Sequence, residues 1–316
     1  MHLLIPFACM DSTGAHQVLQ GTTLPHLEKL MARMTRLGTD LHAPSTLSPP
    51  HERAQALLQG LPSEVDGGIA WAARERAQSA ESPGTQAWAL ITPCHWTVNS
   101  DHIVMSDPQS LNLTEDESRA LLEAVRPYFE EDGIRMAYAR PGQWLAQSDL
   151  FRGMATASVD RVAGGNIDGW LPRSAHAAPL RRLQNEMQML LYTHPVNDAR
   201  SSAGLQAVNS FWVSGTGALP ENFQPSLSPS NPLVVANDLR TAAIAQDWPA
   251  WIQAWKTVDA TQCTALLQEV EAGRQASLTL CGDRGCITFN TQPTGFFGKI
   301  MRHFGHQPLY SLREQL

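Results

Sequence analysis

The sequence predicts a mixed α/β fold, with a mixed sheet, flanking helices and local hairpins. Short apolar runs of strand length alternate along the chain with segments whose apolar residues recur at helical spacing. Several neighbouring strand-like runs are separated by short turn sequences, which is typical of hairpins. Hydrophobic residues make up 43% of the 316 positions, which is enough for a substantial core and excludes global disorder.

Local signals place the elements of the first half. Thr114, with Glu117 three residues later, forms a capping box before a helix that ends at Gly133. The prolines after Ser48 mark another helix start, whereas residues 74–86 are polar and are expected to form a surface excursion. The expected strands are 3–7, 88–92, 95–98, 102–105, 135–139 and 143–146, and the expected helices begin at about 22, 50 and 114.

The second half contains the clearest helix, residues 178–192, in which Leu180, Leu183 and Met187 follow helical periodicity. A short helix capped by Asn197 should follow, and then a strand over 208–213 that ends at small residues 214–217. Later expected elements are a strand at 233–236, a tryptophan-rich helix after Asp247, and a hairpin of 278–281 with 286–289.

Composition shifts suggest a domain organisation. Residues 1–217 are expected to form the main α/β core. Residues 218–232 carry four prolines and three serines and are expected to form a long loop. Residues 233–316 should form a C-terminal α/β part packed on the same core.

Composition also excludes several functions. The formal net charge is −7, from 23 basic against 30 acidic residues, so nucleic acid is not an expected partner. None of the three lysines lies in a phosphate-binding P-loop motif, and no dinucleotide-binding glycine motif follows a strand. No apolar stretch approaches the length of a membrane span, whereas an amphipathic segment over 296–304 could contact a protein partner.

The five cysteines are scattered and odd in number, so we expect neither a disulfide framework nor a paired-cysteine zinc site. Cys281 and Cys286 flank a hairpin turn and can lie opposite each other, but a reducing compartment favours free thiols. We therefore expect a cytoplasmic protein.

A first candidate site combines Cys94, His95, Asp101 and His102, with Asp11 as a further carboxylate, because such side chains are zinc donors. The hairpin register decides whether the two histidines can meet. A three-residue loop would place them on opposite faces, whereas a two-residue loop of Ser100 and Asp101 would place them on one face.

A second candidate site follows the 178–192 helix. His194 lies just beyond its C-terminus, where the helix dipole favours the protonated imidazole. Together with Asn197 and Arg200, which is expected at the surface, His194 would suit a carboxylate or phosphate ligand. The alternative is that these residues only form the turn between two helices.

A third candidate segment follows closely. Its small residues would let the backbone approach an anion after a strand, and a tight turn is the alternative. The members of this segment are Asn209, Ser210, Ser214, Gly215, Thr216 and Gly217.

Together these two segments form a compound motif, from His194-Pro195 through Asn197, Arg200 and Gly204 to Asn209 and Gly215-Thr216-Gly217. The motif resembles cofactor-independent phosphoglycerate mutases of the archaeal type, in the alkaline-phosphatase-like superfamily. Over nearly the whole chain the sequence is similar to an uncharacterised bacterial family labelled phosphoglycerate mutase or RpfE-type regulatory protein. The further segments that carry this resemblance are 47–54, 92–96, 156–162 and 183–191.

The resemblance implies an alkaline-phosphatase-like core, but the chain departs from the enzymes, which use two divalent metals and a nucleophilic serine. Their Asp-Gly turn after the first strand is missing, with only Asp11 nearby, and their late Asp/His cluster has no counterpart. Ser214 replaces an arginine that precedes their G-x-G segment. Metal-assisted phosphoryl transfer without ligands loses its main charge stabilisation.

These observations predict a mutase-like protein without a cofactor that binds a small phosphorylated or carboxylate ligand and has a regulatory role. One alternative is an active phosphomutase or phosphatase with a relocated divalent metal site at Asp11, His95, Asp101 and His102. Another is a protein-interaction or assembly factor.

Overall fold

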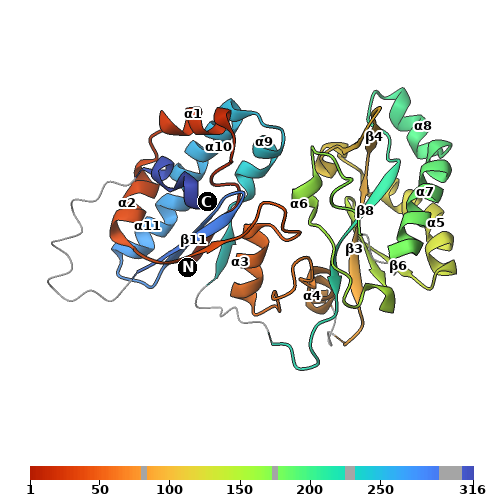
Figure 1. Ribbon diagram of the computed structural model, residues 1–316, viewed down its shortest axis with the longest axis horizontal. Helices are drawn as coiled ribbons and strands as arrows, with labels where there is room; N and C mark the ends of the chain where they lie inside the picture. The colour runs from red at the N-terminus through yellow and green to blue at the C-terminus, as the bar shows by residue number, and fades with distance from the viewer. Residues whose placement is uncertain (80–83, 173–176, 225–231, 292–307) are drawn as a thin grey trace. The chain divides into compact units, whose positions relative to one another are not determined.

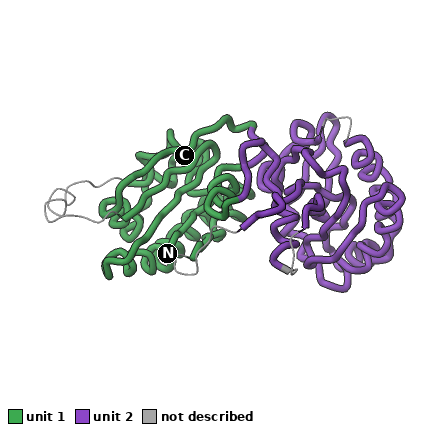
Figure 2. Tube along the Cα trace, turned by 90° about the horizontal axis from the view of Figure 1, so that it is seen from below, with its two compact units in different colours: residues 1–45, 49–60, 225–316 green, residues 46–48, 61–224 purple. Residues whose placement is uncertain are grey.

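The structure is a computed structural model in which the chain forms two compact units, shown in Figure 2. It describes residues 1–79, 84–172, 177–224, 232–291 and 308–316. Unit 1 comprises residues 1–45, 49–60 and 225–316, and unit 2 comprises residues 46–48 and 61–224. The mixed α/β class predicted from the sequence is confirmed.

This division differs from the sequence-based one of 1–217, 218–232 and 233–316. The N-terminal strand pairs with two strands from the C-terminal segment, so residues 1–45 belong to unit 1. Backbone pairing over such a long sequence separation leaves no local signal. Within the predicted loop, residues 225–231 lie outside the described part of the chain.

Unit 1 contains a five-stranded mixed sheet in the order β2-β11-β10-β1-β9. The central strand β1 is parallel to both β9 and β10, whereas β11 is antiparallel to β10 and β2. The strands are β1 (His2–Ile5), β2 (Thr35–Leu41), β9 (Leu233–Val235), β10 (Ser277–Cys281) and β11 (Gly285–Asn290).

Helices cover both faces of this sheet (Figure 1). Leu3 and Ile5 pack into the larger core with the tryptophans of α10, whereas Leu4 faces the side that α3 covers. Burial on both faces explains why β1 is a continuous apolar run. The helices are α1 (Thr13–Gln20), α2 (Pro25–Arg33), α3 (Pro50–Gln59), α9 (Arg240–Ile244), α10 (Trp248–Val258) and α11 (Thr264–Glu271).

Unit 2 contains a four-stranded antiparallel sheet in the order β6-β7-β3-β8 and a separate β4-β5 hairpin. Its strands are β3 (Trp88–Cys94), β4 (Trp96–Val98), β5 (Ile103–Met105), β6 (Arg135–Arg140), β7 (Gln143–Gln147) and β8 (Ser210–Gly217). The helices are α4 (Trp71–Ser79), α5 (Glu115–Glu131), α6 (Val159–Val162), α7 (Ala178–Tyr192) and α8 (Pro195–Ser202).

The residues of β8 alternate between two hydrophobic cores. Phe211 and Val213 pack with α5 and α7, whereas Trp212 packs on the opposite face with Trp96 and Val162. Figure 1 shows α5 and α7 on one side of this sheet and α4 and α6 on the other. The strand is therefore buried on both faces and fixed in register by its side chains.

The strand predicted over 208–213 does not end at Ser214, because β8 continues through the small residues to Gly217. Ser214 pairs with Leu90 and Gly217 with Trp88. The step from one pair to the next is therefore three residues on β8 and two residues on β3. Gly215 has φ +60° at this β-bulge, a conformation that glycine adopts readily. The tight turn weighed in the sequence analysis is thus a bulge within a strand.

Several elements have no clear sequence signal. Helix α1 has no counterpart among the elements predicted from the sequence. Helix α4 overlaps the predicted surface excursion and has almost no amphipathic pattern. The edge strand β2 is exposed along nearly its whole length, so it lacks alternating polarity. No helix in the described ranges is long and apolar enough to cross a membrane.

We expect Gly215→Ala to lower the thermal stability of the protein. An added Cβ would lie 2.9 Å from Cβ of Trp71, at a positive φ that alanine disfavours. The expected cost is about 1–3 kcal/mol of unfolding free energy, measured by thermal and urea denaturation. Gly142→Ala is the control, since its Cβ meets no atom within 4 Å. Equal stability of the two variants would contradict a structural role for the bulge.

Candidate functional site

Within the mutase-like motif, Arg200 is a fully buried charged residue, whose side chain is 1% exposed. Its Nε donates to Gln206 O at 2.8 Å, and one terminal nitrogen donates to Leu111 O at 2.7 Å. The other terminal nitrogen lies 3.0 Å from Oε1 of Glu117. The expectation that Arg200 lies at the surface is wrong, because its position on α8 directs its side chain inward onto these acceptors.

Glu117 has two structural tasks. Its Oε2 accepts from the backbone N–H of Thr114 at 2.9 Å and completes the predicted capping box of α5, while Oε1 holds Arg200. Burial alone would raise the pKa of Glu117, but the hydrogen bonds from Thr114 and the nearby guanidinium outweigh it and lower the pKa. The carboxylate is therefore ionised in the folded protein near neutral pH.

Asn197 joins the end of α7 to the start of β8. Its Nδ2 donates to Leu191 O at 2.8 Å and to Val208 O at 2.7 Å, and its Oδ1 accepts from Val208 N at 2.8 Å. With only 4% exposure, the amide is fully used within the chain. The expected capping role is wrong, since His194 caps α8 instead.

His194 caps α8 through Nδ1, which accepts from the backbone N–H of Val196 at 3.2 Å. The side chain is therefore engaged with the helix that follows it. Its positive charge, expected from the dipole of the preceding helix, stays a prediction.

Asn209 mimics a backbone pairing partner. Its Oδ1 accepts from Trp96 N at 2.7 Å, and its Nδ2 donates to Trp96 O at 2.8 Å. The amide thus fixes β4 beside the start of β8. His194, Asn197 and Asn209 lie near this end of β8, whereas Gly215 lies about 20 Å along the strand at roughly 3.3 Å per residue.

The remaining motif residues are buried within β8. Thr216 donates to Met154 O at 2.5 Å and contacts the hydroxyl of Thr156 at 3.0 Å. The Oγ of Ser210 has no hydrogen-bond partner among the described residues, while Ser214 is 6% exposed. Gly217 has φ +136° and packs close to Ala70. Ligand binding at these positions stays a prediction, and the geometry gives them a structural role.

The β4-β5 hairpin settles the register question for the candidate metal residues. Val98 pairs with Ile103, and Asn99 N donates to His102 O at 2.9 Å, so Ser100 and Asp101 form a two-residue turn. This register places His95 and His102 on one face. They lie about 13 Å apart along the hairpin at roughly 3.3 Å per residue, which is too far for one metal ion.

Each of these side chains also has another neighbour. Nδ1 of His95 lies 2.8 Å from Ala207 O, and Nδ1 of His102 lies 2.6 Å from a carboxylate oxygen of Asp101. Asp11 belongs to the other unit. In the parts of the chain that the structure describes, no three His, Cys, Asp or Glu residues come together as a metal site.

Cys281 and Cys286 pair directly across the β10-β11 hairpin and are free thiols, as the sequence predicts. Both are buried, and Cys286 Sγ lies 3.1 Å from Pro50 O. Burial raises the pKa of Cys281 well above its ordinary range. Such thiols are poor nucleophiles because the thiolate is the reactive form.

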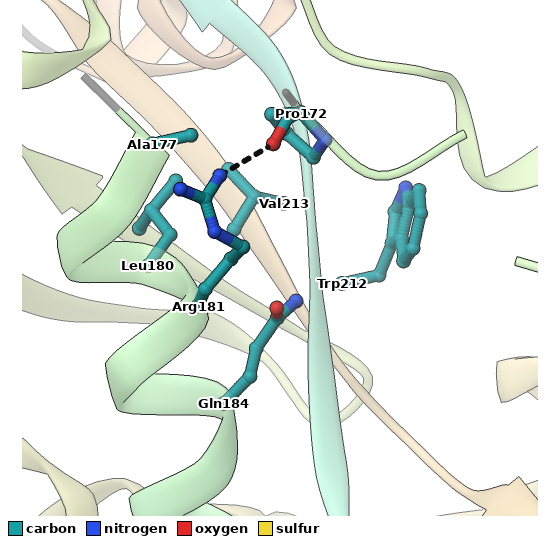
Figure 3. Close-up of a pocket in the computed structure, with 7 residues that line it drawn as sticks. All are labelled: Pro172, Ala177, Leu180, Arg181, Gln184, Trp212 and Val213. Carbon is teal, nitrogen blue, oxygen red and sulfur yellow. Dashed lines mark hydrogen bonds between the residues drawn. The ribbon is translucent and has the colours of Figure 1, made fainter. Parts of the chain in front are cut away.

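Figure 3 shows a small apolar gap between α7 and β8. Arg181 closes one side by donating to Pro172 O at 3.0 Å, and Gln184 lies beneath it, 3.4 Å from Phe211 O. The gap has a volume of about 10 Å³. That is the minimum for one water molecule, so it does not accommodate an organic ligand.

A second concavity in unit 2, here called the Trp170 groove, has a volume of about 510 Å³. This lies within the roughly 300–1,000 Å³ that is usual for ligand sites. Leu150, Met154, Trp170 and Leu171 supply most of its apolar wall, and Arg152 is its one cationic side chain among the described residues. The sequence analysis did not find it, because its residues come from irregular segments without a motif.

Comparisons with known proteins relate the chain to one class of enzyme. It is 24% identical over 73% of its length to a Geobacter sulfurreducens protein named "Probable 2,3-bisphosphoglycerate-independent phosphoglycerate mutase", covering 58% of that protein. It is 23% identical over 67% of its length to a Methanosarcina mazei protein named as such a mutase, covering 53% of it. The chain thus spans about half the length of the curated relatives it matches, at low identity.

Two solved structures also align with the chain. Over 99% of the chain, a cofactor-independent phosphoglycerate mutase from Thermoplasma acidophilum aligns with 13% identity and a TM-score of 0.37, covering 97% of that protein. A Pyrococcus horikoshii protein aligns over 92% of the chain and 87% of its own, with 12% identity and a TM-score of 0.41. No family model matches the chain.

We expect Arg200→Met to destabilise unit 2 strongly. It leaves two carbonyl oxygens without their donor and the partly exposed Glu117 carboxylate without its cation. Each buried polar group left without a partner costs about 1–3 kcal/mol of unfolding free energy, measurable by urea denaturation. Arg182→Met, on the exposed side of α7, should change the midpoint little. A stable, soluble Arg200→Met variant with an unchanged midpoint would refute this structural role.

We expect Glu117→Gln to reduce the acid sensitivity of folding. Because the folded pKa of Glu117 is depressed, its contribution is present above the ordinary value of 4.5 and is lost as pH falls through the folded pKa. Unfolding free energies measured between about pH 3 and about pH 7 should therefore converge for variant and parent toward low pH. Glu123→Gln, at an exposed surface pair, is the control. A constant difference across this range would contradict the linkage.

Proposed function

We propose that this chain is a phosphoglycerate-mutase-like protein with an alkaline-phosphatase-like core and a non-catalytic role. It binds a small phosphorylated or carboxylate ligand and acts as a regulatory protein, in line with the RpfE-type resemblance of its sequence. No cofactor takes part in this role. The similarity to mutases over 67–73% of the chain supports the family relationship, and the motif residues support the non-catalytic role.

One observation carries the proposal. The arginine and the two asparagines that the mutase-like motif would offer to a phosphorylated substrate are bonded to this chain's own atoms. Arg200 binds Glu117 and two carbonyl groups. In Asn197 and in Asn209, both the amide nitrogen and the amide oxygen form hydrogen bonds with the backbone. Opening these contacts for a substrate would cost the hydrogen bonds of a buried network.

The end of β1 supports the same proposal. In the enzymes that the sequence resembles, an Asp-Gly turn follows the first strand. Here Pro6 and Phe7 follow Ile5, and Phe7 has φ +55°, a conformation that usually calls for glycine. Its ring lies 5.1 Å from the ring of His51. The two residues that directly follow this strand thus offer an aromatic contact and no carboxylate.

Two parts of the sequence-based expectation remain proposals. The amphipathic segment 296–304, proposed as a protein-binding element, lies outside the described residues. The cytoplasmic location agrees with the free thiols but rests on the sequence alone.

We expect the purified protein to lack stoichiometric zinc, manganese and magnesium and not to interconvert 3- and 2-phosphoglycerate. Elemental analysis and an enolase-coupled assay, with and without added manganese, measure both properties. An archaeal cofactor-independent mutase serves as the positive control. Two metal ions per chain, or turnover after manganese addition, would support the alternative of a relocated metal site.

The binding part of the proposal has its own measurement. A ligand that binds only the folded state raises the melting temperature in proportion to the logarithm of its concentration above Kd. We expect phosphate, 3-phosphoglycerate or a simple carboxylate to produce such a shift. If none does at millimolar concentration, the ligand-binding role is abandoned in favour of a protein-interaction role.

A further inference from the structure

We propose that the Trp170 groove of unit 2 binds a small aromatic compound with one negative charge, its ring against Trp170 and its anionic group at Arg152. This inference rests on the proposed function, because it names the class of anionic ligand and places its site away from the mutase-like motif. The described residues that line the groove all belong to unit 2.

The size and lining of the groove favour a fused or substituted ring. Its volume of about 510 Å³ accommodates a two-ring compound with room for a substituent. Leu150, Met154 and Leu171 offer apolar surface to such a ring, and none of the described residues that line the groove is acidic. An apolar wall without a carboxylate accepts an aromatic anion and disfavours a cation or a sugar.

Trp170 supplies the aromatic surface. The indole is half-buried and packs against the core formed by Trp96, Val162 and Trp212. Among the described residues, no aromatic ring or cation stacks on it. An indole held by a core on one side and lining a groove is a preformed stacking surface for a planar ligand.

Arg152 supplies one oriented positive charge. One terminal nitrogen donates to Thr85 O at 2.9 Å and lies 3.2 Å from a carboxylate oxygen of Asp149. Its Nε and other terminal nitrogen have no partner among the described residues. These contacts anchor one nitrogen of a side chain that is 53% exposed and leave donors to spare, which suits a carboxylate or sulfonate. Because Asp149 already offsets part of the charge, a monoanion fits better than a dianion.

Gly169 provides a way to close the groove without disturbing the core. It lines the groove, and a Cβ built there meets no atom within 4 Å. Its φ is not positive, so another residue can adopt the same backbone. Gly169→Leu therefore introduces a side chain into open space. Gly142→Leu, in the β6-β7 turn, is the matched control, because it is equally open and does not line the groove.

The test uses two probes of similar shape, naphthalene-1-sulfonate and neutral 1-naphthol, titrated into the full chain by isothermal titration calorimetry. We expect one saturable site for both. Arg152→Gln should weaken the sulfonate about tenfold or more and change naphthol little, since only the sulfonate forms a charge-assisted hydrogen bond. Gly169→Leu should abolish binding of both, and Gly142→Leu should have no effect. Each variant must retain the parent melting temperature.

Absence of saturable sulfonate binding to the parent, unaltered binding to Gly169→Leu, or equal loss of both probes in Arg152→Gln would each overturn the proposal. The coupled mutase assay is run on the same samples. Mutase turnover would refute the non-catalytic role while leaving the groove titration intact. A failed titration with no turnover would refute the groove alone, so the two failures remain distinguishable.

Discussion

The buried guanidinium of Arg200 organises one end of unit 2. It connects the capped start of α5, the turn before that helix, and the segment that leads into β8, through Glu117, Leu111 and Gln206. A charge with 1% exposure is tolerable only because all sides of the guanidinium are bonded. Asn197 and Asn209 then fix α7 and β4 to the same strand. The placement of β8 depends on this network.

The same residue types can serve a substrate or a scaffold, and geometry alone separates the two uses. A substrate-binding arginine keeps donors directed into a cavity, whereas Arg200 directs its donors at carbonyl groups and one carboxylate. In the Trp170 groove the situation is reversed, because Arg152 uses one nitrogen to hold its position and keeps the others available. The sequence motif singles out Arg200 as a ligand-binding residue and does not include Arg152, which is the reverse of what the geometry indicates.

Elements with a strong local signal could be predicted from the sequence. The capping box at Thr114, the apolar spacing of α7 and the turn between β10 and β11 all appear as expected, because neighbouring residues decide them. The candidate site could be predicted only as a set of residues. Whether Arg200 points inward depends on Leu111 and Glu117, which lie more than 80 positions away. The bulge at Gly215 and the exposed strand β2 likewise depend on partners that local periodicity does not contain.

Unit 1 is formed by segments that precede and follow unit 2 in the sequence, and this has a consequence for folding during synthesis. Strand β1 is synthesised more than 200 residues before its two neighbours in the sheet, residues 233–235 and 277–280. Unit 2, drawn mainly from residues 61–224, has all its strands synthesised before either neighbour exists. Domains generally fold as units during synthesis, so unit 2 can complete its core while β1 waits as an unpaired apolar strand. The nascent chain therefore carries an unpaired, aggregation-prone strand until residues 233–235 and 277–280 are made, and this is the interval in which a chaperone would matter most.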